Sequence, residues 1–382
     1  MKYGLLVYKD TENIGDDIQS YVAKRFLPQI DYYVEREELD TFFPDEKEKV
    51  SIIMNGWFLH KKYNFPPTDY INPLLISMHF ATGNKWTLEK KRYLENFTKE
   101  YLNKEGPVGA RDISTLEKLN SVGINSYFSG CMTLTISKFD FIKSNEEYVC
   151  AVDLCDETYN KLFKYTNLKI IRKTHKLNKD ENSNLTYEKR FENVERLLKL
   201  YQGAKFVVTT RLHCVLPCLA LGVPVILLYD DDSINRLGTY KSLLTIGTEK
   251  DFIEGTLELE FKDNKGELLK IRNDLITRCE KFIEDSRHVT DNELMEIVDY
   301  KETNKIDYIL WKKEIMTIEM EDIKRDLYSA QEYIKELEVR NGELEREVEQ
   351  LNEKISHIKN RKLYKMIDIV DEIRGDKNSE NK

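Results

Sequence analysis

The feature that most constrains this 382-residue chain is an alternation that continues to about residue 230. Short apolar runs rich in β-branched residues alternate with longer segments of helical periodicity. This order is typical of parallel sheets joined by crossover helices, in which ligands bind beyond the carboxyl ends of the strands. A second series of the same kind begins after residue 147. We therefore predict an α/β protein with two Rossmann-like lobes, over 1–143 and 144–300, that face a cleft.

The apolar runs and periodic segments locate the expected elements. In the first lobe, strands are expected over 3–8, 50–54, 74–79 and 108–111, and helices over 16–27, 87–102 and 113–121. In the second lobe, strands are expected over 148–154, 168–172, 206–210, 225–229 and 257–261, and helices over 187–201, 214–221 and 265–285.

The C-terminal segment follows a different pattern. From 316 to 358, mostly apolar residues recur every seven positions in two sets, one with β-branched residues where it is best formed and the other mostly Leu. A single polar residue, Asn341, lies in this seam, and the combination favours a parallel two-stranded coiled coil. We predict a coiled coil over 310–362 that forms a homodimer, and a frayed end over 375–382. The alternative is one solvated helix that folds back on the lobes.

Charge and composition exclude several classes of protein. With 59 Lys and Arg against 68 Asp and Glu, the net charge of −9 argues against a nucleic-acid-binding surface. The six cysteines show no CxxC or zinc spacing, so we expect no metal and a reduced, cytoplasmic protein. The N-terminus lacks the features of a signal peptide. The longest stretch without Asp, Glu, Lys or Arg, 212–229, is shorter than the ~20 residues of a spanning helix, so no membrane span is expected.

The strongest chemical signal follows the buried strand expected over 206–210. Arg211 and His213 come next, before an apolar helix. Since Pro217 is tolerated in the first turn of a helix, we expect this helix to start near Cys214, with Arg211 and His213 on the turn ahead of it. A guanidinium, an imidazole and a helix N-terminus at one sheet edge favour bound anionic oxygen. Alternatively, Arg211 pairs with a structural carboxylate and His213 is a core histidine.

Two further loops place polar residues after expected strands. Arg111 can point into the cleft or form a surface ion pair, and Asp112 beside it can cap the next helix. In the loop after the first strand, Gly15 would let a ligand approach the backbone. Asp16 in the same loop can bind sugar hydroxyls, act as a base or cap the helix.

The remaining histidines carry weaker signals. His60 and His79 follow expected strands and are candidates to face the cleft, whereas His175, His288 and His357 are expected on the surface. No GxGxxG, Walker or HExxH pattern is present. The sequence therefore predicts neither a dinucleotide site nor a metalloprotease site.

In order along the chain, three segments resemble the polysaccharide pyruvyl transferase family. They are the Asn-x-Gly-Asp loop at 13–16, the Ala-Arg-Asp-x-Ser segment at 110–114, and the Arg-Leu-His turn at 211–213 followed by Ala-x-Gly-x-Pro at 220–224. The resemblance covers about residues 1–235. It implies a two-lobed fold like that of GT-B glycosyltransferases. It also implies transfer of a pyruvyl group from phosphoenolpyruvate to two sugar hydroxyls, which yields a cyclic ketal and phosphate.

By the same resemblance, Arg111 and Arg211 hold the phosphate and carboxylate of phosphoenolpyruvate. Leu212 helps through its backbone, and His213 is the general acid. The residue chemistry agrees, since the ordinary pKa of His, ~6.5, suits proton transfer near neutral pH and Arg suits both anionic groups. No cofactor is expected beyond this co-substrate. The predicted site comprises catalytic His213 and Asp16, donor-binding Arg111, Arg211 and Leu212, and the acceptor or cleft residues Asn13, Gly15 and His79.

Two other functions are compatible with these residues. A GT-B glycosyltransferase would use the same lobes for a nucleotide sugar, with Arg211 on the diphosphate. A catalytically silent scaffold would use the coiled coil to recruit other polysaccharide enzymes.

Overall fold

The computed structural model describes residues 1–382 except 47, 59–64, 81–93, 95, 142–145, 230–237, 258–259, 263–264, 289–304 and 377–382. The chain forms two compact units, Met1–Met316 and Thr317–Lys382. Three predictions fall wholly or partly outside the described residues. They concern His60, residues 87–93 and 95 of the expected helix 87–102, and residues 377–382 of the expected frayed end.

The first sheet has six parallel strands in the order β2-β1-β3-β4-β5-β6. Apolar, β-branched residues make the central strands almost fully buried. The strands are β1 (Lys2–Val7), β2 (Tyr32–Glu35), β3 (Val50–Phe58), β4 (Ile71–Phe80), β5 (Val108–Ala110) and β6 (Ser126–Phe128), and the helices are α1 (Ile14–Lys24), α3 (Phe97–Glu105) and α4 (Ile113–Ser121), with short 3-10 turns η1 (Arg36–Glu38) and η2 (Met132–Thr135).

The second sheet has five parallel strands in the order β11-β10-β9-β7-β8. Helices precede or follow each strand, as the alternation in the sequence predicts. The strands are β7 (Tyr148–Val152), β8 (Lys169–Lys173), β9 (Val207–Thr209), β10 (Val225–Tyr229) and β11 (Thr245–Thr248), and the helices are α5 (Asp156–Leu162), α6 (Lys179–Ser183), α7 (Tyr187–Gly203), α8 (Leu212–Leu221) and α10 (Glu249–Glu254), with η4 (Gly238–Tyr240).

The prediction of two parallel α/β sheets is confirmed, but three strands were not predicted. These are β2, β6 and β11, each of only three or four residues. The strand expected over 257–261 is wrong for the described part of that range, since Leu257, Glu260 and Phe261 lie in irregular backbone. The fifth strand is instead β11, whose sequence Thr-Ile-Gly-Thr contains a single large apolar residue and so shows no apolar run.

One hydrophobic core joins the two lobes. The buried face of α1, including Ile18 and Val22, packs with Val194 and Leu198 of α7 and with residues of α8. Beside this core, the buried guanidinium of Arg190 on α7 pairs with Asp17 on α1 and donates to the Tyr8 carbonyl at 2.6 Å. The lobes are therefore fixed to each other by packing and by a buried ion pair.

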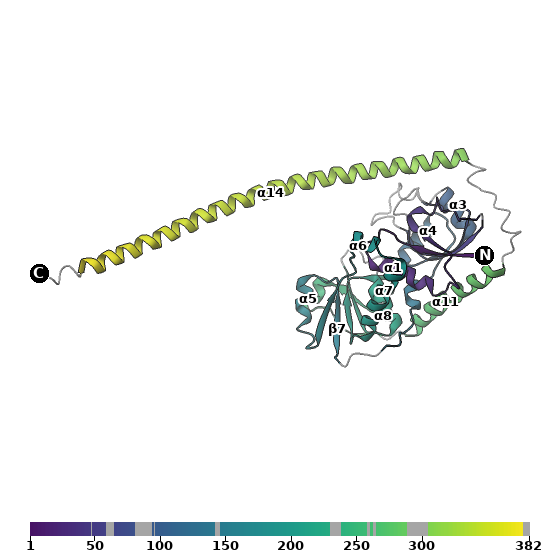
Figure 1. Ribbon diagram of the computed structural model, residues 1–382, viewed down its shortest axis with the longest axis horizontal. Coiled ribbons are helices and arrows are strands. Elements are labelled where there is room, and N and C mark those ends of the chain that lie inside the picture. The colour runs from purple at the N-terminus through teal and green to yellow at the C-terminus, as the bar shows by residue number, and fades with distance from the viewer. Residues whose placement is uncertain are drawn as a thin grey trace. The chain divides into compact units, whose positions relative to one another are not determined.

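Two long helices complete the chain. Helix α11 (Lys265–His288) returns to the first sheet, where Ser51 Oγ donates to Ser286 Oγ at 3.1 Å. Helix α14 (Lys305–Asp376) is continuous over 72 residues (Figure 1). Its first turns belong to the first unit and bury Trp311, which packs on Phe97. Among the described residues, no helix has the length and apolarity needed to cross a membrane.

In the second unit, the repeated apolar residues of α14 share one property. The side chains at the expected seam are 44–58% exposed in the single chain: Met320, Ile323, Leu327, Ile334, Leu337, Leu344, Val348, Leu351, Ile355 and Ile358. A single helix with such an exposed stripe buries none of its apolar face. Its stability in water therefore depends on the intrinsic helix propensity of its residues or on packing against a second helix.

Candidate functional site

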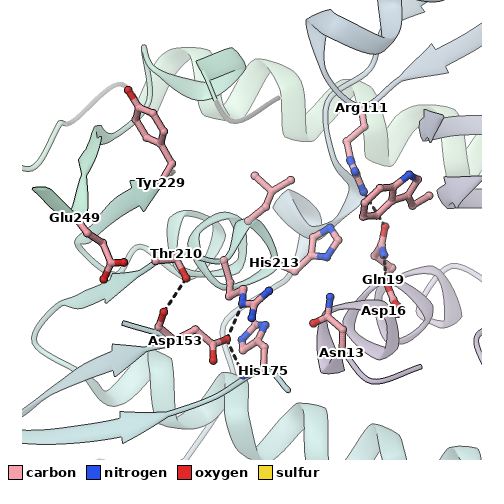
Figure 2. Close-up of a pocket in the computed structure, with 13 residues that line it drawn as sticks. Asn13, Asp16, Gln19, Arg111, Asp153, His175, Thr210, His213, Tyr229 and Glu249 are labelled. Atoms are coloured by element: carbon pink, nitrogen blue, oxygen red, sulfur yellow. Dashed lines mark hydrogen bonds and ion pairs between the residues drawn. The ribbon is translucent and has the colours of Figure 1, made fainter. Parts of the chain in front are cut away.

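A cavity of about 360 Å³ lies between the two sheets and takes its lining from both (Figure 2). This volume is at the low end of the range for small-molecule sites. The lining residues are Asn13, Asp16, Gln19, Trp57 and Arg111 from the first lobe, and Asp153, His175, Thr210, Arg211, Leu212, His213, Tyr229 and Glu249 from the second.

The strand order explains why these residues meet. In each sheet the order reverses once, between β1 and β3 in the first and between β7 and β9 in the second. Ligands of open parallel sheets bind at the carboxyl ends of the strands at such a reversal. Asn13 and Trp57 flank the first reversal, and Asp153 and Arg211 flank the second. The cavity therefore lies between the two places where the strand order reverses, one in each sheet.

Arg111 reaches the cavity from the carboxyl end of β5. Its side chain is only 2% exposed, and one terminal nitrogen donates to Gln19 Oε1 at 3.3 Å. The backbone is fixed by Tyr240 of the second lobe, whose hydroxyl donates to the Arg111 carbonyl at 2.7 Å. Among the described residues, Nε has no hydrogen-bond partner and lies 3.8 Å from Asp112 Oδ2. A buried cation with an unused donor in a cavity wall is suited to an anionic ligand.

Arg211 extends from the carboxyl end of β9 and is held by Asp153. Its Nε donates to Asp153 Oδ2 at 2.7 Å, while about a third of the side chain remains exposed. The same carboxylate accepts from Thr174 Oγ1 at 2.6 Å and from the His175 N–H at 3.0 Å. Burial would raise the pKa of Asp153, but these hydrogen bonds and Arg211 hold it below its ordinary value. Asp153 thus stays charged and orients the guanidinium.

Helix α8 starts earlier than expected, at Leu212, with Arg211 as its N-cap residue. His213 is therefore in the first helical turn, and Pro217 lies inside the helix, which corrects the expectation of a start near Cys214. Pro217 is tolerated because the bond it cannot make is to the His213 carbonyl, at the very start of the helix. Leu212 and His213, which open α8, line the cavity next to Arg211, so the positive end of the α8 dipole lies at this wall.

The loop before α1 packs directly on His213. Asn13 caps α1 by accepting from the Gly15 N–H at 3.0 Å. A Cβ added to Gly15 would lie 3.0 Å from His213 Nδ1 and 3.1 Å from its Cβ, so no side chain fits there without displacing the imidazole. Gly15 therefore allows His213 to lie against α1, and Figure 2 shows His213 between the Arg111 and Asn13 sides of the cavity.

Asp16 lines the cavity, whereas His79 does not. The Asp16 carboxylate accepts from Thr11 Oγ1 at 2.6 Å and from Gln19 Nε2 at 3.2 Å. His79 is 6% exposed, and its Nδ1 lies 2.8 Å from Asp112 Oδ2. This corrects the expectation that His79 faces the cleft, because the Asp112 carboxylate holds it in the core. Asp112 also caps α4, as predicted.

His175 is buried, which corrects its expected place on the surface. It is 1% exposed, lines the cavity and has Nε2 2.8 Å from the Tyr201 hydroxyl. Its carbonyl accepts from the Ile14 N–H at 3.0 Å, and the next loop residues continue the pairing, with Leu177 N–H donating to Glu12 O at 2.7 Å. Main-chain hydrogen bonds thus connect the two lobes at the floor of the cavity.

Sequence reasoning missed seven lining residues: Gln19, Trp57, Asp153, His175, Thr210, Tyr229 and Glu249. Asp153 could have been recognised from the sequence, because an acidic residue inside an expected buried strand is unusual. Glu249 could not, because the strand before it was not predicted. Among the described residues, no group of three or more His, Cys, Asp or Glu is placed to hold a metal ion.

Two parallel α/β lobes with a polar, charged cavity between their strand ends define a two-lobed α/β protein with a candidate ligand site at the lobe boundary. A model of the polysaccharide pyruvyl transferase family matches residues 13–232, more than half of the chain. The chain belongs to the polysaccharide pyruvyl transferase family and is a transferase. The matched range contains Arg111, Arg211 and His213. No curated protein matches the sequence.

Solved structures resemble the chain only distantly. An uncharacterized protein from Klebsiella pneumoniae has 13% identity over 62% of this chain and 86% of its own, with a TM-score of 0.36. A UDP-GlcNAc 2-epimerase from Methanocaldococcus jannaschii, solved with UDP-GlcNAc and UDP, has 9% identity over 76% of this chain and 100% of its own, with a TM-score of 0.36. These similarities are too distant to bear on substrate or mechanism.

Proposed function

We propose that this protein transfers the pyruvyl group of phosphoenolpyruvate to two hydroxyls of a sugar residue during polysaccharide biosynthesis. The observation that carries this proposal is the convergence of Arg111, Arg211 and His213 on one cavity from two lobes. A small donor with both a carboxylate and a phosphate needs two separate cationic groups. Two arginines more than 90 residues apart in sequence supply them.

In the proposed complex, Arg111 and Arg211 bind the two anionic groups of the donor. Arg111 is rigid because it is buried, and Arg211 is oriented through Nε by Asp153, which leaves its terminal nitrogens for the ligand. The Leu212 N–H at the start of α8 adds a backbone donor and the positive end of the helix dipole. Such a preorganised set also stabilises the phosphate as it leaves.

The proposed chemistry begins at His213, which donates a proton to the methylene carbon of the donor and makes the neighbouring carbon electrophilic. One sugar hydroxyl adds there and gives up its proton, for which Asp16 is the proposed base. The second hydroxyl then replaces the phosphate, and its proton leaves with the phosphate or returns to the site. The products are a cyclic ketal with a new methyl group, and inorganic phosphate. Proton transfer of this kind typically contributes 10²–10⁴-fold to the rate, a rough expectation for His213.

We further propose that two chains associate through a parallel coiled coil along α14. In its central and C-terminal part, the exposed apolar stripe has the β-branched residues Ile334, Val348 and Ile355 at one repeated position and Leu337, Leu344 and Leu351 at the other, which is the two-stranded preference. Asn341 in the seam would fix the register. All six cysteines are free, and this agrees with a reducing, cytoplasmic setting.

The test is an incubation of the full-length protein with phosphoenolpyruvate and a panel of sugar acceptors, including lipid-linked and nucleotide-linked sugars. We expect phosphate release that depends on the acceptor, together with an acceptor mass that gains one pyruvyl ketal. Release of nucleotide from a sugar nucleotide, without phosphate release from phosphoenolpyruvate, would instead identify a glycosyltransferase. No turnover with any acceptor, together with full cellular function of a His213 variant, would support a scaffold.

A further inference from the structure

The cavity continues away from Arg111 into the second lobe. There its wall is formed by Tyr229 at the end of β10, Glu249 at the start of α10, and Thr210 after β9 (Figure 2). All three side chains are partly exposed, and none carries a positive charge. In Figure 2, Tyr229 and Glu249 lie on the opposite side of His213 from Arg111 and Gln19. The two ends of the cavity therefore differ in chemistry.

The polar atoms at this second end are only partly used. Glu249 Oε1 accepts from the Cys155 N–H at 2.9 Å, and Thr210 Oγ1 donates to the Asp153 carbonyl at 2.9 Å. Within the described part of the chain, neither the Tyr229 hydroxyl nor the second oxygen of Glu249 forms a hydrogen bond. At the first end, by contrast, both oxygens of Asp16 already accept hydrogen bonds.

A phenol ring and a carboxylate that line the same end of a cavity are suited to a hydroxylated ring. The apolar face of a sugar packs on an aromatic ring, and a carboxylate accepts strong hydrogen bonds from hydroxyls. The same carboxylate repels a second carboxylate or a phosphate. Among the described residues that line the cavity, the arginines are Arg111 and Arg211, which the proposed donor would already pair. The chemistry of this wall thus discriminates by charge.

We propose that Tyr229 and Glu249 form the subsite for the acceptor sugar, and that this subsite selects an uncharged sugar ring over a uronate or a phosphorylated sugar. The ring packs on Tyr229 and donates hydroxyl hydrogen bonds to Glu249, while its reacting hydroxyl pair points toward His213. This inference rests on the proposed function, because the sugar bound at this subsite is an acceptor only if the protein transfers a pyruvyl group. The binding preference itself is measurable without turnover.

The experiment is saturation-transfer NMR on the full-length protein with phosphoenolpyruvate present. The probes are methyl glycosides of glucose, galactose and mannose, and the methyl glycosides of the matching uronic acids. The variants are Glu249→Gln, which keeps the acceptor for Cys155 N–H but loses the charge, and Tyr229→Phe, which loses only the hydroxyl. Glu254→Gln is the matched control, since Glu254 lies on the same helix outside the cavity.

We expect at least one neutral glycoside to bind, with affinity about tenfold lower in Glu249→Gln, as a lost charged hydrogen bond predicts, and unchanged in Glu254→Gln. The preference for neutral over uronic glycosides should shrink in Glu249→Gln. Equal binding of neutral and charged glycosides by the natural protein, no binding of any glycoside, or unchanged binding in both cavity variants would overturn the subsite. Failure of the proposed function would appear separately, as absence of phosphoenolpyruvate binding in calorimetry.

Discussion

Arg211 Nε donates to Asp153 Oδ2 at 2.7 Å, across the point where the strand order of the second sheet reverses. Asp153 has a φ of +54°, a left-handed conformation that is uncommon for a residue with a side chain. That conformation lets its carboxylate bind Thr174, His175 and Arg211 at once. Arg211 does pair with a carboxylate, as the alternative interpretation of the sequence held, yet this pairing orients the guanidinium within the cavity wall.

Asp153→Asn is expected to weaken donor binding. The substitution removes the negative charge that orients Arg211, and a hydrogen bond to a charged group is worth about 1.5–3 kcal/mol, so the dissociation constant for phosphoenolpyruvate should rise roughly tenfold or more. Calorimetric titration with phosphoenolpyruvate measures this change. Asp156→Asn is the control, because Asp156 lies three residues further on and its side chain is 84% exposed. Equal affinities in the two variants would show that Asp153 does not orient Arg211 for the donor.

His213→Gln is expected to separate binding from turnover. Gln keeps a polar side chain of similar size but cannot act as a general acid, so phosphate release should fall by about 10²–10⁴-fold. Phosphoenolpyruvate affinity should change little, since the arginines supply the charge. His357→Gln on the exposed surface of α14 serves as the control. Retained turnover in His213→Gln would exclude the acid role.

Gly15→Ala is expected to lower activity by displacing His213. The new methyl group would lie 3.0 Å from His213 Nδ1, so the imidazole must shift by a few tenths of an ångström. A shift of this kind at a proton donor should reduce kcat several-fold or more, with a smaller effect on the KM for phosphoenolpyruvate. Gly266→Ala is the matched control, because nothing lies within 4 Å of its added Cβ. Identical kcat values for Gly15→Ala and the natural protein would show that the contact with Gly15 does not position His213.

Asp112 is expected to make the fold sensitive to acid. Burial alone would raise its pKa, but the hydrogen bond and charge of His79, and the charge of Arg111, lower it far below the ordinary value of 3.8. A carboxyl whose pKa is lowered by folding stabilises the native state above its ordinary pKa. This contribution is lost as pH falls through 3.8 toward the folded value.

Urea unfolding at several pH values between 5 and 3 measures this contribution. Below pH 4, the free energy of unfolding should fall more steeply for the natural protein than for Asp112→Asn, which keeps a side-chain cap for α4. Glu117→Gln, an exposed position on the same helix, should follow the natural protein. Parallel curves for the natural protein and Asp112→Asn would contradict the lowered pKa.

Leu344→Asp is expected to dissociate the proposed dimer. Leu344 is 44% exposed in the single chain and lies three residues after Asn341 in the repeated seam, so a charge there would be buried in a coiled coil. Sedimentation equilibrium should give twice the mass of one chain for the natural protein and a single-chain mass for the variant. Arg346→Gln, outside the seam, should remain dimeric. A natural protein that sediments as a monomer would reject the coiled coil.

The parts of the site that sequence could predict were those next to an element with a clear apolar pattern. Arg211 and His213 follow a buried strand and precede an apolar helix, so their place at a sheet edge was readable from local pattern. Glu249 was not found, because β11 before it reads Thr-Ile-Gly-Thr and has no apolar run to mark a strand. His175 was misplaced, because its burial depends on α7 and on the loop before α1, which are distant in sequence.

The sequence by itself determined the alternation of strands and helices, the heptad repeat of α14 and the polar residues that follow β5 and β9. These properties depend on neighbours within one or two turns, so periodicity and chain-breaking residues suffice to read them. Only the tertiary structure decided that Arg111, Arg211 and His213 share one cavity. Their meeting depends on α1 packing against α7 and α8 in a common core, and the free energy of that packing comes from contacts between residues far apart along the chain.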